Sequence, residues 1–317
     1  MKIFLIVGLL IGTFTSSLLC NGSLKEKVKY TSVEKGNQLL MQEDDYTKNW
    51  SQFDIDSRMQ KKNSSKAELF EFIKKQTREW TSSEKNTLDS IFDNIDKLIK
   101  KNGFNIDFPD EIYIVKTTAK DEGGAFGFTR ANYIVLKDDA IYSKQVDLTH
   151  LVLHELFHVL SRNNPEFRKE MYSLIGFRIM ESVDYPESIK QYRISNPDAT
   201  QTDSYISLKV GEQSVDCMMI MYSKRDYDGG VFFNYVNIGF LSLVGEEVKA
   251  IEYIDNNAVL YEINQVSGFF EQVGMNTQYI INPEEIMAEN FSLAILGNND
   301  LPSQELVEKI KVVLKKG

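Results

Sequence analysis

Apolar residues recur at three- and four-residue intervals in four parts of the chain, the spacing typical of amphipathic helices. The pattern predicts helices over 67–80, over 82–102 with a serine cap at its start, over 148–162, and from about Asn282 onward. Gly103 directly follows the second helix, where a left-handed residue commonly ends a helix.

Strand patterning occupies the intervening parts. Residues 112–117 are rich in β-branched side chains, 133–136 form a second apolar run, and 204–264 alternate as several strands do. The glycine-rich segment 122–129 lacks the spacing of a phosphate-binding loop and precedes no nucleotide-binding helix. We therefore interpret it as a flexible edge strand beside a cleft. The order helix, strand, helix, strand, helix predicts an α+β fold.

The first twenty residues have the features of a secretory signal peptide. Lys2 precedes an apolar run over 3–11 that is too short to span a membrane, and a small polar stretch follows it. Cys20 ends a sequence that resembles a relaxed bacterial lipoprotein box, although Leu19 stands where that motif has a small residue. The protein is therefore expected to be exported, to the periplasm or the outside of the cell. Cys20 either carries a lipid anchor or is lost by cleavage nearby.

The rest of the chain divides into two parts by composition. Residues 21–65 are polar, with scattered aromatic residues and no steady period, which favours a tether or a loosely packed N-terminal extension. Residues 66–317 are expected to form one globular domain, with a β-rich insertion at about 204–264.

Composition and charge exclude several classes of protein. The 317 residues are 42% hydrophobic, 11% aromatic and 26% charged, which is ordinary for a globular protein and too apolar for a disordered one. A net charge of −10 argues against a nucleic-acid partner, because such proteins need a basic face. Two cysteines cannot build a disulfide framework, and only three histidines occur.

All three histidines lie in the segment 150–158, which contains the pattern His154-Glu155-x-x-His158. Helical residues four apart are separated by about 40° around the axis and roughly 6 Å along it, so both imidazoles can reach one zinc ion. Glu155 lies on the flank of the same face, where a carboxylate can take the proton of zinc-bound water. A structural helix without metal is the alternative, since this short pattern also occurs in proteins without zinc.

The apolar residues of this helix lie opposite the histidines. With His154 placed at zero, an arc between about 140° and 260° holds Val152, Leu153, Leu156, Val159 and Leu160. Histidines of a packed core would lie inside that arc. The separation therefore predicts that the histidine face opens to a catalytic cleft.

His150 lies four residues before His154 and is a tempting third ligand. It stands roughly 12 Å along the axis from His158, too far for three rings on one helix to bind one tetrahedral ion. We expect His150 to touch the ligands or line the cleft wall, and a plain surface histidine is the alternative.

The third ligand is predicted to be a carboxylate, because no other histidine exists and Cys217 is isolated. The extended metzincin motif is excluded, since Ser161 and Asn164 stand where it requires a glycine and a third histidine. The best donor of a carboxylate is the segment 282–291, which reads N-P-E-E-I-M-A-E-N-F.

With this segment the chain resembles the gluzincin metallopeptidases, the thermolysin-like clan. The resemblance implies that Glu285 is the third zinc ligand and that Glu289, four residues later, steadies His154. Glu284 does not fit this pairing, because Ala288 lies four residues after it. The resemblance covers about twenty residues in two short segments, and the interval between them is long for that clan.

A helix cap is the alternative role for Glu285. Asn282 is a good N-cap, Pro283 suits the first helical position, and Glu285 then stands at the third position of a capping box. Acidic residues there also complement the helix dipole.

The resemblance implies a zincin-like domain in which one zinc ion supports hydrolysis of peptide or protein substrates. Glu155 is the expected general base, and residues 125–129 are expected to align an extended substrate by edge pairing. Tyr205 and Tyr279 are candidates for stabilising the oxyanion, with a packed aromatic side chain as the alternative for each. The alternative function is a non-enzymatic surface protein or lipoprotein that uses a zincin-like fold for binding.

Overall fold

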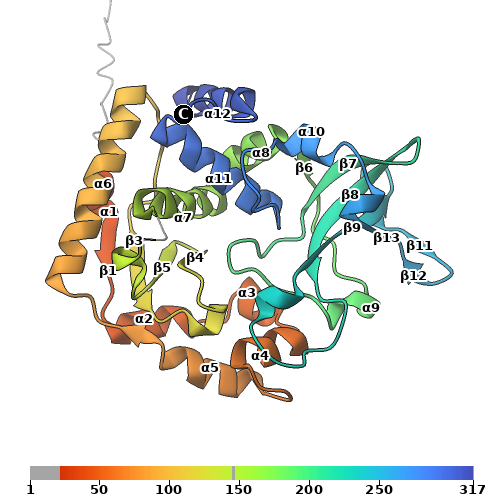
Figure 1. Cartoon of the computed structure of the whole chain (residues 1–317), viewed down its shortest axis with the longest axis horizontal. Coiled ribbons are helices and arrows are strands. Elements are labelled where there is room, and N and C mark those ends of the chain that lie inside the picture. The colour runs from red at the N-terminus through yellow and green to blue at the C-terminus, as the bar shows by residue number, and fades with distance from the viewer. Residues whose placement is uncertain (1–21, 145–146, 317) are drawn as a thin grey trace, which may run out of the picture.

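The computed structural model describes residues 22–144 and 147–316, so the predicted signal segment 1–20, with Cys20, lies outside the described residues. The predicted α+β class is confirmed: most of the helices gather around one sheet, and a second sheet lies to the side (Figure 1). No helix among the described residues is long and apolar enough to cross a membrane.

The first sheet is mixed and has the strand order β1-β3-β5-β4. Strands β1, β3 and β5 are parallel, β4 pairs antiparallel with β5 at the edge, and β2 pairs antiparallel with β3. Its strands are β1 (Val28–Tyr30), β2 (Thr77–Arg78), β3 (Ile112–Thr117), β4 (Gly127–Arg130) and β5 (Tyr133–Lys137). Both predicted strands are confirmed, and the glycine-rich segment does lead into an edge strand.

The second sheet is antiparallel and contains the predicted β-rich region. Its strands are β6 (Phe177–Ile179), β7 (Ser204–Val210), β8 (Gln213–Tyr222), β9 (Asn237–Val244), β10 (Ala250–Ile251) and β13 (Leu260–Glu262), and β11 (Tyr253–Ile254) and β12 (Asn257–Ala258) form a separate pair. Residues 232–235 are a 3₁₀ turn and not part of a strand. There Phe232 and Tyr235 are buried in a small cluster with Phe53 instead of extending the sheet.

The N-terminal segment is folded, which corrects the expectation of a tether or loose extension over 21–65. It forms α1 (Leu24–Lys27), α2 (Val33–Leu40), α3 (Asp45–Lys48) and α4 (Gln52–Met59), and β1 joins the first sheet. Leu40, Phe53 and Arg58 are buried. Helices this short show no steady apolar period, and several of the polar residues, such as Ser32 and Ser51, are helix N-caps.

The longer helices carry the predicted signals at their ends. They are α5 (Lys66–Lys74), α6 (Ser82–Asn102), α7 (Leu148–Asn163), α8 (Pro165–Ser173), α11 (Pro283–Leu296) and α12 (Gln304–Lys316), with short α9 (Glu187–Lys190) and α10 (Phe269–Val273). Gly103 ends α6 in the left-handed conformation, as predicted, with a φ of 66°. The predicted helix 67–80 is shorter than expected, because Thr77 and Arg78 pair with β3.

The main core extends from the first sheet through the helices α6, α7, α11 and α12 to the strands β6, β7, β8 and β9 of the second sheet. Figure 1 shows α7 and α11 side by side near the centre of the molecule, and the two helices are in direct contact. Leu153 and Phe157 of α7 and Phe291 of α11 are completely buried in this core. Packing between these two helices fixes the relative positions of the histidine segment and the acidic segment.

Candidate metal centre

Helix α7 presents one face to the core and the other to α11. Its N-cap is Asp147, whose side chain accepts hydrogen bonds from the Thr149 and His150 amides. The predicted apolar arc is buried, as expected. The expectation that the histidine face opens to a cleft is wrong, because α11 covers it and leaves His154 7% and His158 0% exposed.

Two imidazoles and one carboxylate converge in the contact between these helices. Glu285 Oε2 lies 2.9 Å from His154 Nε2 and 3.5 Å from His158 Nε2. Ligand atoms that each lie about 2.05 Å from one tetrahedral zinc ion are separated by roughly 3.3 Å. The two observed distances fall on either side of that value, so these three side chains are spaced as a zinc site requires. Their role as ligands stays a prediction.

The other ring nitrogens are held by two further carboxylates of α11. His154 Nδ1–H donates to Glu289 Oε1 at 3.0 Å, the contact that the resemblance implied. His158 Nδ1–H donates to Glu284 Oε1 at 3.1 Å. Such bonds direct the Nε2 lone pair of each ring toward a metal and increase its basicity.

The sequence pattern set Glu284 aside, whereas the structure places it beside His158. Its carboxylate also accepts hydrogen bonds from Ser161 Oγ and from Tyr172 OH, the latter at 2.5 Å. The pairing of acidic residues four apart on α11 did not indicate Glu284, because Glu284 contacts the second histidine, His158, and not the first. Its hydrogen-bond partners lie on α7 and α8. Nothing in the local spacing of the sequence marks these contacts.

The carboxylate of Glu285 points into the centre and not back to the start of its helix. Asn282 caps α11 through the Glu284 amide. The two Glu285 oxygens are engaged by His154 and by the side-chain amide of Asn196. The geometry therefore favours the ligand role of Glu285 over the capping box.

The residues present fit a metal ion on two grounds. His158 Nε2 is buried without a hydrogen-bond partner, although it faces Glu285 at 3.5 Å. The other ground is charge. Five carboxylates gather here, whereas Arg168 faces only Glu284 among them and Arg162 acts on Asp198. The five belong to Glu155, Asp198, Glu284, Glu285 and Glu289. Buried negative charge of this density needs a cation, either protons on the rings or a metal.

The pKa values follow from the same arrangement. Burial opposes the charge on His154, but hydrogen bonds to Glu285 and Glu289 outweigh it and raise the pKa to about 10. The pKa of His158 is also raised, since the charge of Asp198 and the neighbouring glutamates outweighs burial. Burial opposes the charge on Glu285, yet the two imidazoles lower its pKa. A divalent cation would release ring protons as it binds.

A carboxylate oxygen of Glu155 lies within 4.8 Å of a ring nitrogen of His158, and Glu155 is 2% exposed. Its Oε2 accepts a hydrogen bond from Thr129 Oγ1 of the edge strand β4 at 2.7 Å. Burial raises the pKa of Glu155, although His158 and His154 oppose the rise. A carboxylate held in this way is suited to accept and hold a proton.

Gly127 of β4 leaves the space that the Glu155 carboxylate occupies. A Cβ at this position would lie 2.7 Å from Glu155 Oε1 and 3.1 Å from Leu151 Cδ1. We predict that Gly127→Ala lowers kcat by up to about 100-fold with the zinc content unchanged, because the carboxylate shifts and the imidazoles do not. Steady-state kinetics and metal analysis of the same preparation measure both quantities. Loss of zinc together with activity would contradict this explanation.

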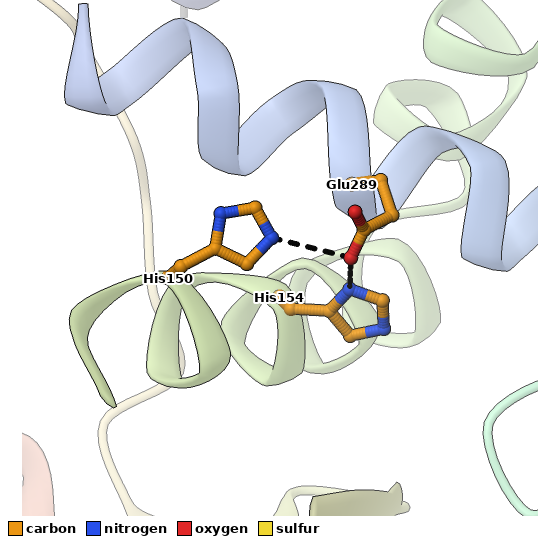
Figure 2. A group of neighbouring side chains, drawn as sticks. All are labelled: His150, His154 and Glu289. Carbon is orange, nitrogen blue, oxygen red and sulfur yellow. Dashed lines mark hydrogen bonds and ion pairs between the residues drawn. The ribbon is translucent and has the colours of Figure 1, made fainter. Parts of the chain in front are cut away.

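His150 contacts Glu289, which in turn contacts His154. This agrees with the expectation that His150 touches the residues around the predicted ligands. Figure 2 shows the Glu289 carboxylate reaching from α11 to both rings of α7, with its Oε1 3.2 Å from His150 Nε2 and 3.0 Å from His154 Nδ1. These three residues form a second group that could hold a metal ion. It is partly exposed, since the side chains of His150 and Glu289 are 26% and 23% exposed.

Replacing His150 separates the two possible groups. We predict that His150→Ala weakens zinc binding by about tenfold or less, because it removes only a contact to Glu289. Competition with a chromophoric chelator measures the affinity. Complete loss of zinc would show that the ion is held by His150, His154 and Glu289 instead.

The two tyrosine candidates have different surroundings. The Tyr279 ring lies 6.2 Å from the His154 ring, so it stays a candidate for stabilising an oxyanion. Tyr205 lies in β7, packed beside Arg178 and Lys249 in the second sheet. The oxyanion role proposed for Tyr205 is therefore wrong, and its alternative as a packed aromatic residue is confirmed.

Sequence reasoning missed the segment Ser195–Asp198, named here the 195–198 strap. The Asn196 side-chain amide donates to Glu285 Oε1, and Asp198 Oδ1 lies 3.9 Å from His158 Nε2. No spacing rule connects these residues to the helix of the histidines. Only the folded chain brings them there.

Comparisons of the chain with protein-family models, with curated proteins and with solved structures find no match. The interpretation of the centre therefore depends on the geometry and chemistry of its own residues.

Proposed function

We propose that this protein is an exported zinc metallopeptidase in which His154, His158 and Glu285 hold one zinc ion. The observation that carries the proposal is the convergence of these side chains while Glu289 and Glu284 hold the outer ring nitrogens. In each imidazole, Nδ1 is hydrogen-bonded to one glutamate and Nε2 faces Glu285. A helix with a purely structural role would not need this arrangement.

A zinc ion held there supplies Lewis acidity, which activates water and polarises a peptide carbonyl. Glu155 accepts a proton at Oε1, while Thr129 fixes its other oxygen. It then delivers that proton to the leaving amine. The edge of β4 offers backbone groups that can pair with an extended substrate.

We also propose that the domain has a zincin-like fold and that the protein is exported. The mixed sheet with its antiparallel edge strand β4, and α7 beside it, are taken to form a zincin-like domain. Export rests on the sequence 1–20 and a lipid anchor on Cys20. These assignments support a peptide or protein substrate met outside the cytoplasm.

One observation favours the alternative of a non-enzymatic zinc-binding module. The cavity beside the centre, lined by Gly127, Asp198 and Tyr279 among others, has a volume of only about 40 Å³. Ligand pockets for small molecules typically measure about 300–1,000 Å³. A cavity of about 40 Å³ is too small to hold a peptide segment.

Metal analysis combined with an activity survey tests the proposal. The purified protein is expected to contain one zinc ion per chain and to cleave members of a peptide library. Chelation should stop cleavage, and zinc should restore it. A carefully prepared wild-type protein without zinc would overturn the proposal, and a zinc-loaded protein without any cleavage would support the binding module.

A further inference from the structure

We propose that the protein is an aminopeptidase, in which Asp198 binds the terminal ammonium of a peptide with a free amino terminus. This inference rests on the proposed function, because it assumes a zinc peptidase centre at His154, His158 and Glu285. It adds the class of substrate and a residue that selects it. Each turnover adds water across the first peptide bond, with the hydroxyl going to the carbonyl carbon and the proton to the leaving amine. One free residue and a peptide with a new amino terminus result.

The free edge of β4 is occupied at Thr129. The Lys137 amide donates to the Phe126 carbonyl at 3.0 Å, so alternate residues of the segment that contains β4 bond to β5. The amides of Gly127 and Thr129 therefore point to the free edge. Asp198 Oδ1 accepts a hydrogen bond from the Thr129 amide at 2.5 Å. An extended substrate can pair with this edge at Gly127 but not at Thr129.

The strap that carries Asp198 is firmly anchored on both sides. Buried Asp54 accepts hydrogen bonds from the Ser195 amide and hydroxyl, both at 2.8 Å. Arg162 donates to the Pro197 carbonyl at 2.7 Å. Anchors of this kind hold the strap in one position. The strap is therefore a fixed wall, and a substrate chain paired with β4 must end beside Asp198.

The space at this wall fits a chain end. The cavity that Asp198 shares with Gly127 and Tyr279 measures about 40 Å³. That is room for roughly three water molecules. A peptide segment cannot pass through it, whereas a terminal amino group can enter. Lysine carries its ammonium on a four-carbon stem, for which the cavity has no room.

The charge at the wall selects the amino terminus over the carboxyl terminus. Asp198 Oδ1 lies 3.9 Å from His158 Nε2, and among the described residues no other basic side chain lies within 4.0 Å of this carboxylate. Arg162 acts on it from farther away. Asp198 Oδ2 accepts no hydrogen bond from the part of the chain that the structure describes. A terminal carboxylate would be repelled by Asp198 and Glu155, whereas an ammonium can donate to Oδ2.

The reach of one residue agrees with this assignment. The α-amino nitrogen of a residue lies about 2.5 Å from its own carbonyl carbon. A carboxylate oxygen of Asp198 lies within 4.8 Å of one from Glu155 and of a ring nitrogen of His158. A first residue can therefore place its ammonium on Asp198 while its carbonyl stays within reach of Glu155.

Two matched peptides test the substrate class on the full zinc-loaded protein. They share one sequence with an internal lysine, and one has a free amino terminus while the other is N-acetylated. Mass spectrometry is expected to show residues leaving the free peptide one at a time, with cleavage of the acetylated peptide slower by about 100-fold or more. Internal cleavage of both peptides at equal rates would overturn the inference and leave the zinc peptidase intact. Cleavage of the acetylated peptide beside its lysine would overturn it too, because a basic side chain would then be the group recognised.

Binding to Glu155→Gln protein gives a second readout that does not depend on turnover. Calorimetry is expected to show that the free peptide binds and that adding Asp198→Asn weakens this binding by about 10- to 100-fold. Asparagine keeps an oxygen for the Thr129 amide but removes the charge. Asp184→Asn is the matched control, since Asp184 is exposed on the stretch of chain before the strap, and it should change nothing. Equal affinity with and without Asp198→Asn would exclude Asp198 as the ammonium site.

Two further results separate this inference from the proposed function. If binding of the free peptide depends on Asp198 while wild type cleaves neither peptide, the ammonium site stands and the peptidase function fails. If the zinc-loaded protein neither binds nor cleaves either peptide, both proposals fail together. Circular dichroism and metal analysis check the fold and the zinc content of every variant.

Discussion

Glu155→Gln is expected to abolish peptide cleavage while the zinc content stays at the wild-type level. Glutamine keeps the size of the side chain and its hydrogen bond to Thr129, but it cannot accept the proton that hydrolysis releases. General acid–base groups typically contribute about 10²- to 10⁴-fold to the rate, so kcat should fall by that factor. Steady-state kinetics with metal analysis of the same samples measures both.

Glu166→Gln provides the matched control for this substitution. Glu166 lies on α8 and its side chain is 86% exposed, so its replacement should change neither zinc content nor turnover. If Glu155→Gln retained full activity, proton transfer by Glu155 would be excluded. If a binding function persisted in this variant while wild type showed no cleavage, the non-enzymatic alternative would gain support.

His154→Ala is expected to remove the zinc ion and the stabilisation that it provides. The substitution deletes one predicted ligand and removes one partner from the buried carboxylate of Glu285 and one from the half-buried carboxylate of Glu289. A ligand present at 100 times its Kd stabilises the folded state by about 2.7 kcal/mol. Chelation should therefore lower the Tm of wild type by several degrees and leave the Tm of the variant unchanged.

His150→Ala is the matched control, because it removes an imidazole from the same helix one turn earlier. That variant should still bind zinc and should still lose thermal stability on chelation. Stoichiometric zinc in purified His154→Ala protein, or a chelator-induced Tm shift of wild-type size, would exclude His154 as a ligand.

The predicted chemistry of α7 came from short-range spacing alone. His154 and His158 share a face because a helix repeats every 3.6 residues, and the apolar arc opposite them could be read from the same wheel. The roles predicted for Glu285 and Glu289 on α11 came instead from the resemblance to the gluzincin metallopeptidases, whose pairing also spans four residues. Edge strand β4 was predicted from its glycine-rich composition and from the strands that flank it.

Residues 22–65 show where such patterns fail. Their helices have four to eight residues each, too few for a period to stand out, so a folded segment that buries Leu40 and Phe53 was predicted as a tether or loosely packed extension. The polar residues that suggested disorder include caps such as Ser51 and the buried ionic pair of Asp54 and Arg58. Burial of paired charges cannot be seen in a composition.

The sequence by itself determined which side chains share a face on each helix, because positions within one helix depend only on its regular geometry. The tertiary structure alone decided that α11 buries the histidine face, that Glu284 holds His158, and that Asp198 faces the same ring. These contacts join segments far apart in the chain, and their positions follow from core packing and from anchors such as Asp54 on Ser195. No local period carries that information, since long-range packing sets it.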